Sequence, residues 1–315
     1  MKVSIPRNIM IGLLAAAGGL LPIAAARAQS APIVFVLVIE NKNWIGSGGI
    51  AGNPAAPYIN HTLAPMAAVA NNYFNPSGNH PSLPNYLWME AGGNFGIHDD
   101  ALPSQHRLTT HAHLTMLLHN AGIPWRAYEE PIYGNVCPLT PEGRYDENGN
   151  RVYQPKHFPQ IYFTDMTSGV NPNSAYCIAH ARPLTQLGYD LQHGAIGRYN
   201  FITPSMCHDG HDPCGGNEIA HIDSWLKAFL PTIFNSSQYK AGHVVLFIVT
   251  DEAANGDGPI MFMALGNGVK KGYKNWTRYT HSSLLRTLQE IYGVRPFLGA
   301  AAYSNDLRDL FKVFP

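Results

Sequence analysis

Charged side chains are scarce in this sequence, and neither sign of charge is in excess. Only 13% of the 315 residues are charged, and 21 Lys and Arg balance 21 Asp and Glu. A chain without a basic excess lacks the electrostatic signature of proteins that bind nucleic acid or anionic membrane surfaces. We therefore expect no nucleic-acid partner.

Long apolar runs are absent beyond the first thirty residues. The run at 9–25 follows Lys2 and Arg7 and precedes a small-x-small pattern at 26–28, which predicts a signal peptide over residues 1–28. A membrane anchor is the alternative, but no other run is long enough to span a bilayer. The pattern favours a periplasmic or secreted protein without a stable membrane anchor.

Cysteine is sparse as well, with four residues and no Cys-x-x-Cys spacing of the kind that zinc sites use. An even number of cysteines in an exported chain instead indicates two disulfides. Cys207 and Cys214 are close in sequence, so we pair them with each other. This leaves Cys137 to pair with Cys177.

Glycine and proline are abundant, at 30 and 24 residues, which is typical of a loop-rich secreted enzyme. The length favours one large α/β domain over residues 29–315. Within that domain, residues 131–180 are irregular and aromatic. We predict that they form a loop-rich insertion over the sheet edge, held by the disulfide between Cys137 and Cys177.

The stretch 33–41 organises the rest of the chain. Seven apolar residues, most of them β-branched, run directly into Glu40 and Asn41. A short, continuous apolar run of this kind predicts a strand buried on both faces. Its carboxyl end would lie at the edge where α/β sheets bind their ligands, although a plain polar exit from the strand is the simpler interpretation.

The same pattern recurs at 243–249, where a second apolar run is followed by Thr250, Asp251 and Glu252. Further strands are predicted at 124–128, 199–203 and 260–265. Helices are predicted between them, at 63–70, 109–122, 183–191, 218–229 and 280–293. This alternation predicts a mostly parallel sheet flanked by helices.

Ser82 lies between two prolines, just before an apolar segment. Proline restricts both its own backbone and that of the residue before it, so this serine is held rigidly at the start of a helix. It could simply cap that helix. A helix N-terminus is also where backbone N–H groups favour a phosphate, which would suit a nucleophile.

The densest polar cluster follows the strand at 199–203, where His208, Asp209, His211 and Asp212 lie within five residues. A solvated turn would rarely use histidine twice. Carboxylates, an amide and a hydroxyl gathered at one sheet edge are ligands for a divalent cation. Phosphoryl transfer depends mainly on such charge and positioning.

Taken together, five motifs in this order resemble the phosphoesterase family, which contains bacterial phospholipases C and secreted acid phosphatases within the alkaline-phosphatase-like superfamily. They are 38–41 (VIEN), 80–86 (HPSLPNY), 201–212 (FITPSMCHDGHD), 250–253 (TDEA) and 280–286 (THSSLLR). The resemblance spans nearly the whole mature chain. It implies an alkaline-phosphatase-like three-layer sandwich.

The resemblance also implies residue roles. Ser82 becomes the nucleophile, and one or two divalent metal ions are held by Glu40, Asn41, Asp251 and Glu252. Asp209 and His211 become phosphate-binding or acid/base groups, and His281 a further active-site histidine. We assign substrate binding to Asn85 and to His157, although a lone loop histidine is more often structural.

Glu252 stands where many superfamily members have His, and this departure from the family pattern concerns whether a second metal site is occupied. Lacking the C-terminal extension of the large phospholipases C, the chain is most similar to the small acid phosphatases. We expect hydrolysis of a small phosphomonoester through a phosphoseryl intermediate, with His211 as a protonated acid. A phospholipase C or phosphodiesterase acting on phospholipid head groups is the alternative, and a non-catalytic binding protein is a remote one.

Overall fold

The computed structural model describes Met1, residues 31–254 and residues 256–315. Apart from Met1, the predicted signal peptide lies outside these residues. The described part is built on an eight-stranded sheet in the order β11-β2-β10-β9-β1-β8-β4-β7. Its strands are β1 (Ile33–Ile39), β2 (Ala68–Ala70), β4 (Trp125–Glu129), β7 (Ala181–Pro183), β8 (Tyr199–Thr203), β9 (Val244–Thr250), β10 (Phe262–Gly266) and β11 (Tyr273–Asn275).

The sheet is mostly parallel, as predicted. β1 pairs in parallel with both β8 and β9, and only β10 runs antiparallel to its two neighbours, β9 and β2. Every residue of β1 and of β9 is buried, because these two strands occupy the centre of a sheet that is covered on both faces. The continuous apolar runs in the sequence reflect this position.

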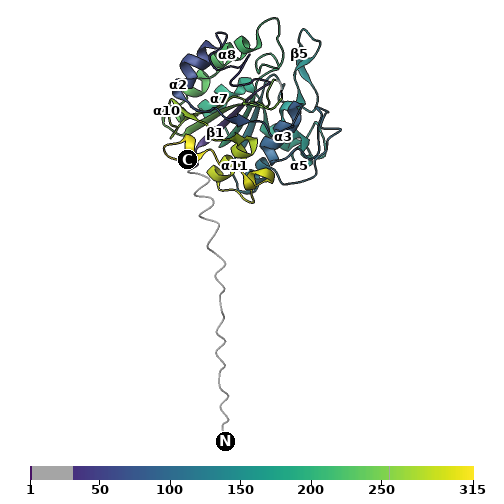
Figure 1. The fold of residues 1–315 in the computed structure, drawn as a ribbon. Helices are drawn as coiled ribbons and strands as arrows, with labels where there is room; N and C mark the ends of the chain where they lie inside the picture. Colours follow the sequence, from purple (N-terminus) through teal and green to yellow (C-terminus); the bar gives the residue numbers. More distant parts are fainter. Residues whose placement is uncertain (2–30, 255) are drawn as a thin grey trace.

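Helices cover both faces of the sheet, which gives three layers (Figure 1). Val34, Val36 and Val38 of β1 face the core that contains α3 (Ser82–Ala91), α4 (Leu114–Asn120) and α11 (His281–Tyr292). The alternate residues of β1 face a second core with α7 (Leu187–His193), α8 (Glu218–Phe229) and α9 (Pro231–Phe234). This division follows from the two-residue period of side chains along a strand.

The remaining elements outside residues 131–186 are short. They are η1 (Ile59–Leu63), α2 (Ala64–Met66), β3 (Tyr73–Phe74), α10 (Ser237–Lys240), β12 (Tyr279–Thr280), η5 (Gly299–Tyr303) and η6 (Arg308–Leu310). β12 pairs with β3 in a separate two-stranded sheet. No helix within the described residues is long and apolar enough to cross a membrane.

Local sequence signals set the ends of the long helices. Asn217 caps α8 by accepting a hydrogen bond from the Ala220 N–H, and Thr280 and Ser283 form a capping box at the start of α11. Gly293 then ends α11 in a left-handed conformation, with φ of 67°, which glycine adopts without steric cost. Both helices were predicted within one or two residues.

Three predicted helices were wrong in extent. The helix predicted at 63–70 stops at Met66, because Ala68–Ala70 is recruited as β2 between β10 and β11. The helix predicted from 109 begins only at Leu114, since His113 is extended. The helix predicted at 183–191 is preceded by β7 and η4 (Leu184–Gln186) and begins at Leu187. In each case tertiary pairing or packing overrides a weak helical preference.

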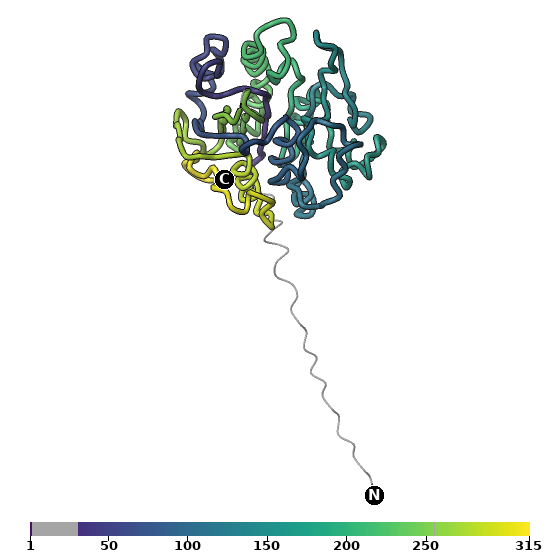
Figure 2. Tube along the Cα trace, turned by 45° about the vertical axis from the view of Figure 1, so that its right-hand side comes forward, coloured from purple at the N-terminus to yellow at the C-terminus, as the bar shows by residue number. Residues whose placement is uncertain are grey.

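Residues 131–180 leave β4 and return as the edge strand β7. They contain a hairpin of β5 (Glu142–Tyr145) and β6 (Arg151–Tyr153), followed by η2 (Pro155–His157), η3 (Pro159–Tyr162), α5 (Thr164–Thr167) and α6 (Ala175–His180). The insertion thus has more regular structure than its sequence suggests. Figure 2 shows these blue-green residues on the side of the molecule away from the C-terminus.

Glu129, the last residue of β4, is an unusual feature of this edge. Its side chain is buried, and neither carboxylate oxygen has a hydrogen-bond partner among the described residues. Burial raises the pKa of Glu129 well above its usual value, although the nearby Thr203 hydroxyl acts in the opposite direction. The folded state therefore favours the protonated, neutral form.

This burial predicts a pH-dependent stability. A raised folded-state pKa contributes stability that is complete below the unfolded-state pKa and is lost as pH rises through the folded-state pKa. Glu129→Gln, which cannot ionise, should therefore raise the melting temperature at pH 8 by several degrees, since about 1 kcal/mol corresponds to roughly 2–4 °C in a domain of about this size. The gain should shrink towards pH 4 in a calorimetric series. The exposed Glu147→Gln is the control, and equal gains at both pH values would contradict the assignment.

Candidate active site

The two predicted strand ends meet at the carboxyl edge of the sheet. β1 and β9 are paired so that Ile39 lies opposite Thr250, which makes Glu40 and Asp251 the next residues on adjacent strands. The Asp251 N–H donates to the Ile39 carbonyl at 2.9 Å, and Asp251 Oδ1 accepts from the Asn41 N–H at 3.0 Å. The pairing of these strands thus brings two buried carboxylates together.

Ser82 is the first residue of α3 and points at this pair. Its Oγ donates to Glu40 Oε2 at 2.9 Å rather than to the backbone of α3, and the N-cap residue is Pro81, whose side chain makes no capping bond. The simpler interpretation of Ser82 as a cap is therefore not favoured. The next N–H along, that of Leu83, donates to Asp100 Oδ1 at 3.0 Å.

Asn85 lies one turn further along α3 and is fully engaged. Its Nδ2 donates to Glu252 Oε2 at 3.0 Å and to the backbone carbonyls of Asn79 and Pro81, while its Oδ1 accepts from Asn79. Glu252 Oε2 also lies 2.5 Å from His80 Nδ1. In this arrangement Asn85 holds Glu252 in place, which favours a positioning role over substrate binding.

His157 is buried beneath the carboxylates. Its Nε2 lies 3.2 Å from Glu40 Oε1 and its Nδ1 3.4 Å from Asp209 Oδ2, both outside hydrogen-bond geometry. The ring stacks on Tyr86, with centroids 5.1 Å apart. Burial, with the charges of Lys156 and His211, lowers the pKa of His157 well below its usual value. A neutral, buried ring suits a supporting role better than direct substrate binding.

His211 forms a second layer of the site. Its Nδ1 lies 2.9 Å from Asp212 Oδ1 and its Nε2 3.2 Å from Lys156 Nζ. Because an ammonium can only donate, Nε2 accepts, and the proton of the neutral ring lies on Nδ1. Burial, then the charges of Lys156 and Lys42, lowers the pKa of His211 to about 3. The protonated imidazole that we expected is not favoured here.

His281 contacts the backbone at the end of β9, next to the carboxylates of the site. It is fully buried at the start of α11, where its Nε2 contacts the Asp251 backbone carbonyl and its Nδ1 lies 3.2 Å from the Tyr73 hydroxyl. Burial lowers the pKa of His281 to about 4. The structure thus places it against the end of β9, on the backbone rather than on the carboxylates.

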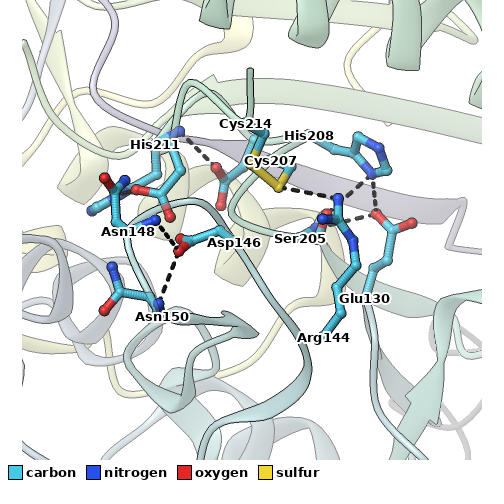
Figure 3. The surroundings of a disulfide bond; sticks show 12 residues. Glu130, Arg144, Asp146, Asn148, Asn150, Ser205, Cys207, His208, His211 and Cys214 are labelled. Atoms are coloured by element: carbon cyan, nitrogen blue, oxygen red, sulfur yellow. Dashed lines mark hydrogen bonds and ion pairs between the residues drawn. A yellow bond between two sulfur atoms is a disulfide. The ribbon is translucent and has the colours of Figure 1, made fainter. Parts of the chain in front are cut away.

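Both predicted disulfides are present, Cys137–Cys177 and Cys207–Cys214. Figure 3 shows Cys207–Cys214, which lies within the loop that follows β8 (residues 204–214, the polar loop), next to Arg144 and Asp146 of the insertion. The hairpin packs on this loop: Met206 N–H donates to the Val152 carbonyl at 2.9 Å, and Arg144 contacts Cys207 Sγ at 3.5 Å. The insertion is therefore part of the wall of the site.

The carboxylates at the centre are not satisfied by the protein alone. Glu40 Oε1, Asp209 Oδ2 and Asp251 Oδ2 are buried and have no hydrogen-bond partner among the described residues. Burial raises the pKa of all three carboxyls well above the usual values, and neighbouring carboxylates raise them further. Burial, then Glu40, likewise raises the pKa of Glu252 to about 8.

A bound cation would relieve this arrangement. Within the described part of the chain, no group of three or more His, Cys, Asp or Glu side chains forms a ready-made metal site. The unpartnered oxygens of Glu40 and Asp251 nevertheless fit a hard divalent cation, because such ions take carboxylate and amide oxygens. Asn41 and Glu252, next to them in the chain, add donors of the same kind.

Two residues that belong to the site, Lys156 and His80, were not identified from the sequence. Lys156 immediately precedes His157, but a single lysine in a loop carries no signal of its own. His80 belongs to the serine motif, yet only the structure places its Nε2 3.3 Å from Asp257 and its Nδ1 against Glu252.

The geometry agrees with comparisons to known proteins. The model of the phosphoesterase family matches residues 53–295. The chain belongs to the phosphoesterase family. As a member it is a hydrolase acting on phosphoric ester bonds, which sets aside the non-catalytic alternative.

Among its relatives, this phosphoesterase is 27% identical to a phosphatidylinositol-3-phosphatase of Mycobacterium tuberculosis, over 95% of this chain and 90% of that protein. It is also 27% identical to a probable acid phosphatase of Kluyveromyces lactis, over 84% of this chain. The match spans only 59% of that fungal protein.

The fold comparison supports the predicted architecture. A protein of the alkaline phosphatase superfamily from Vibrio parahaemolyticus superposes with a TM-score of 0.54 at 12% identity, over 91% of this chain and 77% of that one. At this identity the likeness concerns the fold alone. It confirms an alkaline-phosphatase-like α/β sandwich.

The neutral state of His211 leads to a prediction about leaving groups. A protonated acid would matter far more for alkyl than for aryl phosphates, by roughly 10²–10⁴-fold, because alkoxides are poor leaving groups. Since the ring is held neutral, His211→Asn should lower kcat/KM for both substrate types to a similar degree. Parallel steady-state measurements decide between the two roles. A selective loss with alkyl phosphates would restore the acid assignment.

Proposed function

We propose that this phosphoesterase is an acid phosphatase that hydrolyses phosphomonoesters through a phosphoseryl intermediate on Ser82. The observation that carries the proposal is the bond from Ser82 Oγ to Glu40 Oε2, at the start of α3. It places a hydroxyl nucleophile beside a carboxylate that can take its proton. Relatives named acid phosphatase support the choice of substrate class.

In the proposed reaction Ser82 Oγ attacks phosphorus while its proton passes to Glu40 Oε2, the P–O bond of the ester breaks, and the leaving alkoxide takes a proton from solvent to become the alcohol. Water then attacks the phosphoserine and gives one proton back to solvent, phosphate is released, and the Ser82 oxygen regains its proton from Glu40. The Asp209 carbonyl accepts a hydrogen bond from the Glu40 N–H at 2.7 Å, the His157 ring lies 3.2 Å from Glu40 Oε1, and Asn85 holds Glu252. Asp251 is held by Asn41 and His281.

We assign a divalent cation to Glu40, Asn41, Asp251 and Glu252. Glu40 would use Oε1, which lacks a partner, while Oε2 stays engaged with Ser82. When bound, such an ion supplies positive charge that offsets the phosphoryl oxygens and the buried carboxylates.

Export to the periplasm or medium is part of the same proposal. It rests on the predicted signal peptide and on the two disulfides, which persist in oxidising compartments.

A lipid-linked monoester is a second candidate substrate. The relative matched over 90% of its length is named phosphatidylinositol-3-phosphatase. A substrate panel separates the candidates: soluble monoesters, a phosphoinositide in vesicles, and choline phospholipids as diesters, each with chelator and metal add-back across pH. Turnover of the diesters alone would favour the phospholipase C alternative.

The nucleophile can be tested directly. Ser82→Ala should lower kcat by several orders of magnitude, as loss of a covalent nucleophile typically does, while the melting temperature changes little. Mass spectrometry of acid-quenched wild type should show a phosphate adduct on Ser82. Activity within about tenfold of wild type, or about 1.4 kcal/mol, would place the nucleophile elsewhere.

The cation assignment predicts linked losses of metal and activity. Glu40→Gln and Asp251→Asn each remove an anionic ligand, so bound metal and turnover should fall together. Elemental analysis of the purified proteins gives the metal content independently of activity. Glu129→Gln, a buried acid of the same sheet edge, is the matched control and should keep its metal. Full metal content in both site variants would refute the assignment.

A further inference from the structure

Two buried lysines reach the candidate site, and they differ in how their N–H groups are used. An ammonium has three donors. Lys42 Nζ donates to the Gly210 carbonyl at 2.7 Å and the Asn41 carbonyl at 3.2 Å, and it pairs with Glu218 at 3.0 Å. Three acceptors occupy three donors, so Lys42 is a structural anchor.

Lys156 has a different environment. Its side chain is only 11% exposed, and Nζ has two partners among the described residues: Asp100 Oδ2 at 3.0 Å and His211 Nε2 at 3.2 Å. One of its three N–H groups is left over. Although burial lowers the pKa of Lys156, the charges of Glu40 and Asp100 outweigh it and raise the pKa above its usual value. The ammonium therefore stays charged at acidic and neutral pH.

Asp100 links this ammonium to the helix start that carries Ser82. One carboxylate oxygen accepts from Lys156 Nζ, and the other accepts from the N–H of Leu83, the residue after Ser82. A single carboxylate thus joins the ammonium to the first turn of α3. The charge of the Lys156 ammonium also interacts with the carboxyl groups of Glu40 and Asp251.

We propose that Lys156 binds the phosphoryl group of the substrate and makes the site selective for monoesters. The inference rests on the proposed function. The free N–H of Lys156 donates to a non-bridging phosphoryl oxygen, while Asp100 and His211 hold the ammonium in position. A monoester dianion carries more charge than a diester monoanion, so it gains more from a fixed cation close by.

The test compares Lys156→Met with Lys42→Met in the metal-loaded enzyme. Lys156→Met should lower kcat/KM for an aryl phosphomonoester by roughly 10²–10³-fold, the range seen when a preorganised donor is removed, and for the matching diester much less. Calorimetric affinity for inorganic phosphate should fall roughly 10- to 100-fold. Lys156→Arg, which keeps the charge, should recover most of both.

Lys42→Met is the matched control, because it removes an equally buried lysine whose donors are all used. It should lower the melting temperature but leave phosphate affinity and the monoester-to-diester ratio within about threefold of wild type. Should Lys156→Met not fold, Asp100→Asn provides a second test. It loosens the ammonium without removing it, and should shift the same ratio in the same direction.

Two results would overturn the inference: unchanged phosphate affinity in Lys156→Met, or equal losses with monoester and diester. Failure of the proposed function looks different. In that case wild type would hydrolyse no phosphoester with any divalent metal, whereas calorimetry with inorganic phosphate would still report on Lys156.

Discussion

The parallel pairing of β1 with β9 is the constraint on which the site depends. It places Glu40 and Asp251 side by side at the carboxyl edge of a fully covered sheet. Burying like charges together is costly unless cations or donors compensate them. The surroundings meet this need in part, through the hydroxyl of Ser82, the N–H of Asn41 and the ammonium of Lys156. The oxygens that remain unpartnered are the physical reason to expect a cation there.

The insertion adds side chains to the site formed at the carboxyl edge of the sheet. It is joined to the polar loop after β8 by the contact between Met206 and Val152, and its η2 carries both Lys156 and His157 into the site. Asp146 of its hairpin and Asp212 of the loop also interact: burial, then the nearby Asp146 carboxyl, raises the pKa of Asp212 to about 7. The insertion thus forms part of the wall of the candidate active site and contributes side chains to it.

The histidines show how strongly surroundings decide the state of one residue type. His157 and His281 are buried and His211 is half-buried, and desolvation holds all three rings neutral. His113, equally enclosed, lies 3.0 Å from Glu90 and 3.1 Å from Asp165, and these two acids outweigh desolvation and raise its pKa to about 9. A neutral histidine can accept as well as donate, which is how His211 orients Lys156.

The sequence by itself determined the central strands, the long helices, both disulfides and the set of polar residues at the carboxyl edge. These features are encoded locally, since continuous apolar runs, caps and cysteine spacing are visible within a few residues. It could not reveal that Ala68–Ala70 would be a strand, because only β10 and β11 supply its partners. Nor could it reveal that Asp100 would link Lys156 to the N–H of Leu83, the residue after Ser82, or that His211 would be neutral. Those outcomes depend on residues far apart in the chain, and on burial and charge that exist only once the insertion packs against the sheet.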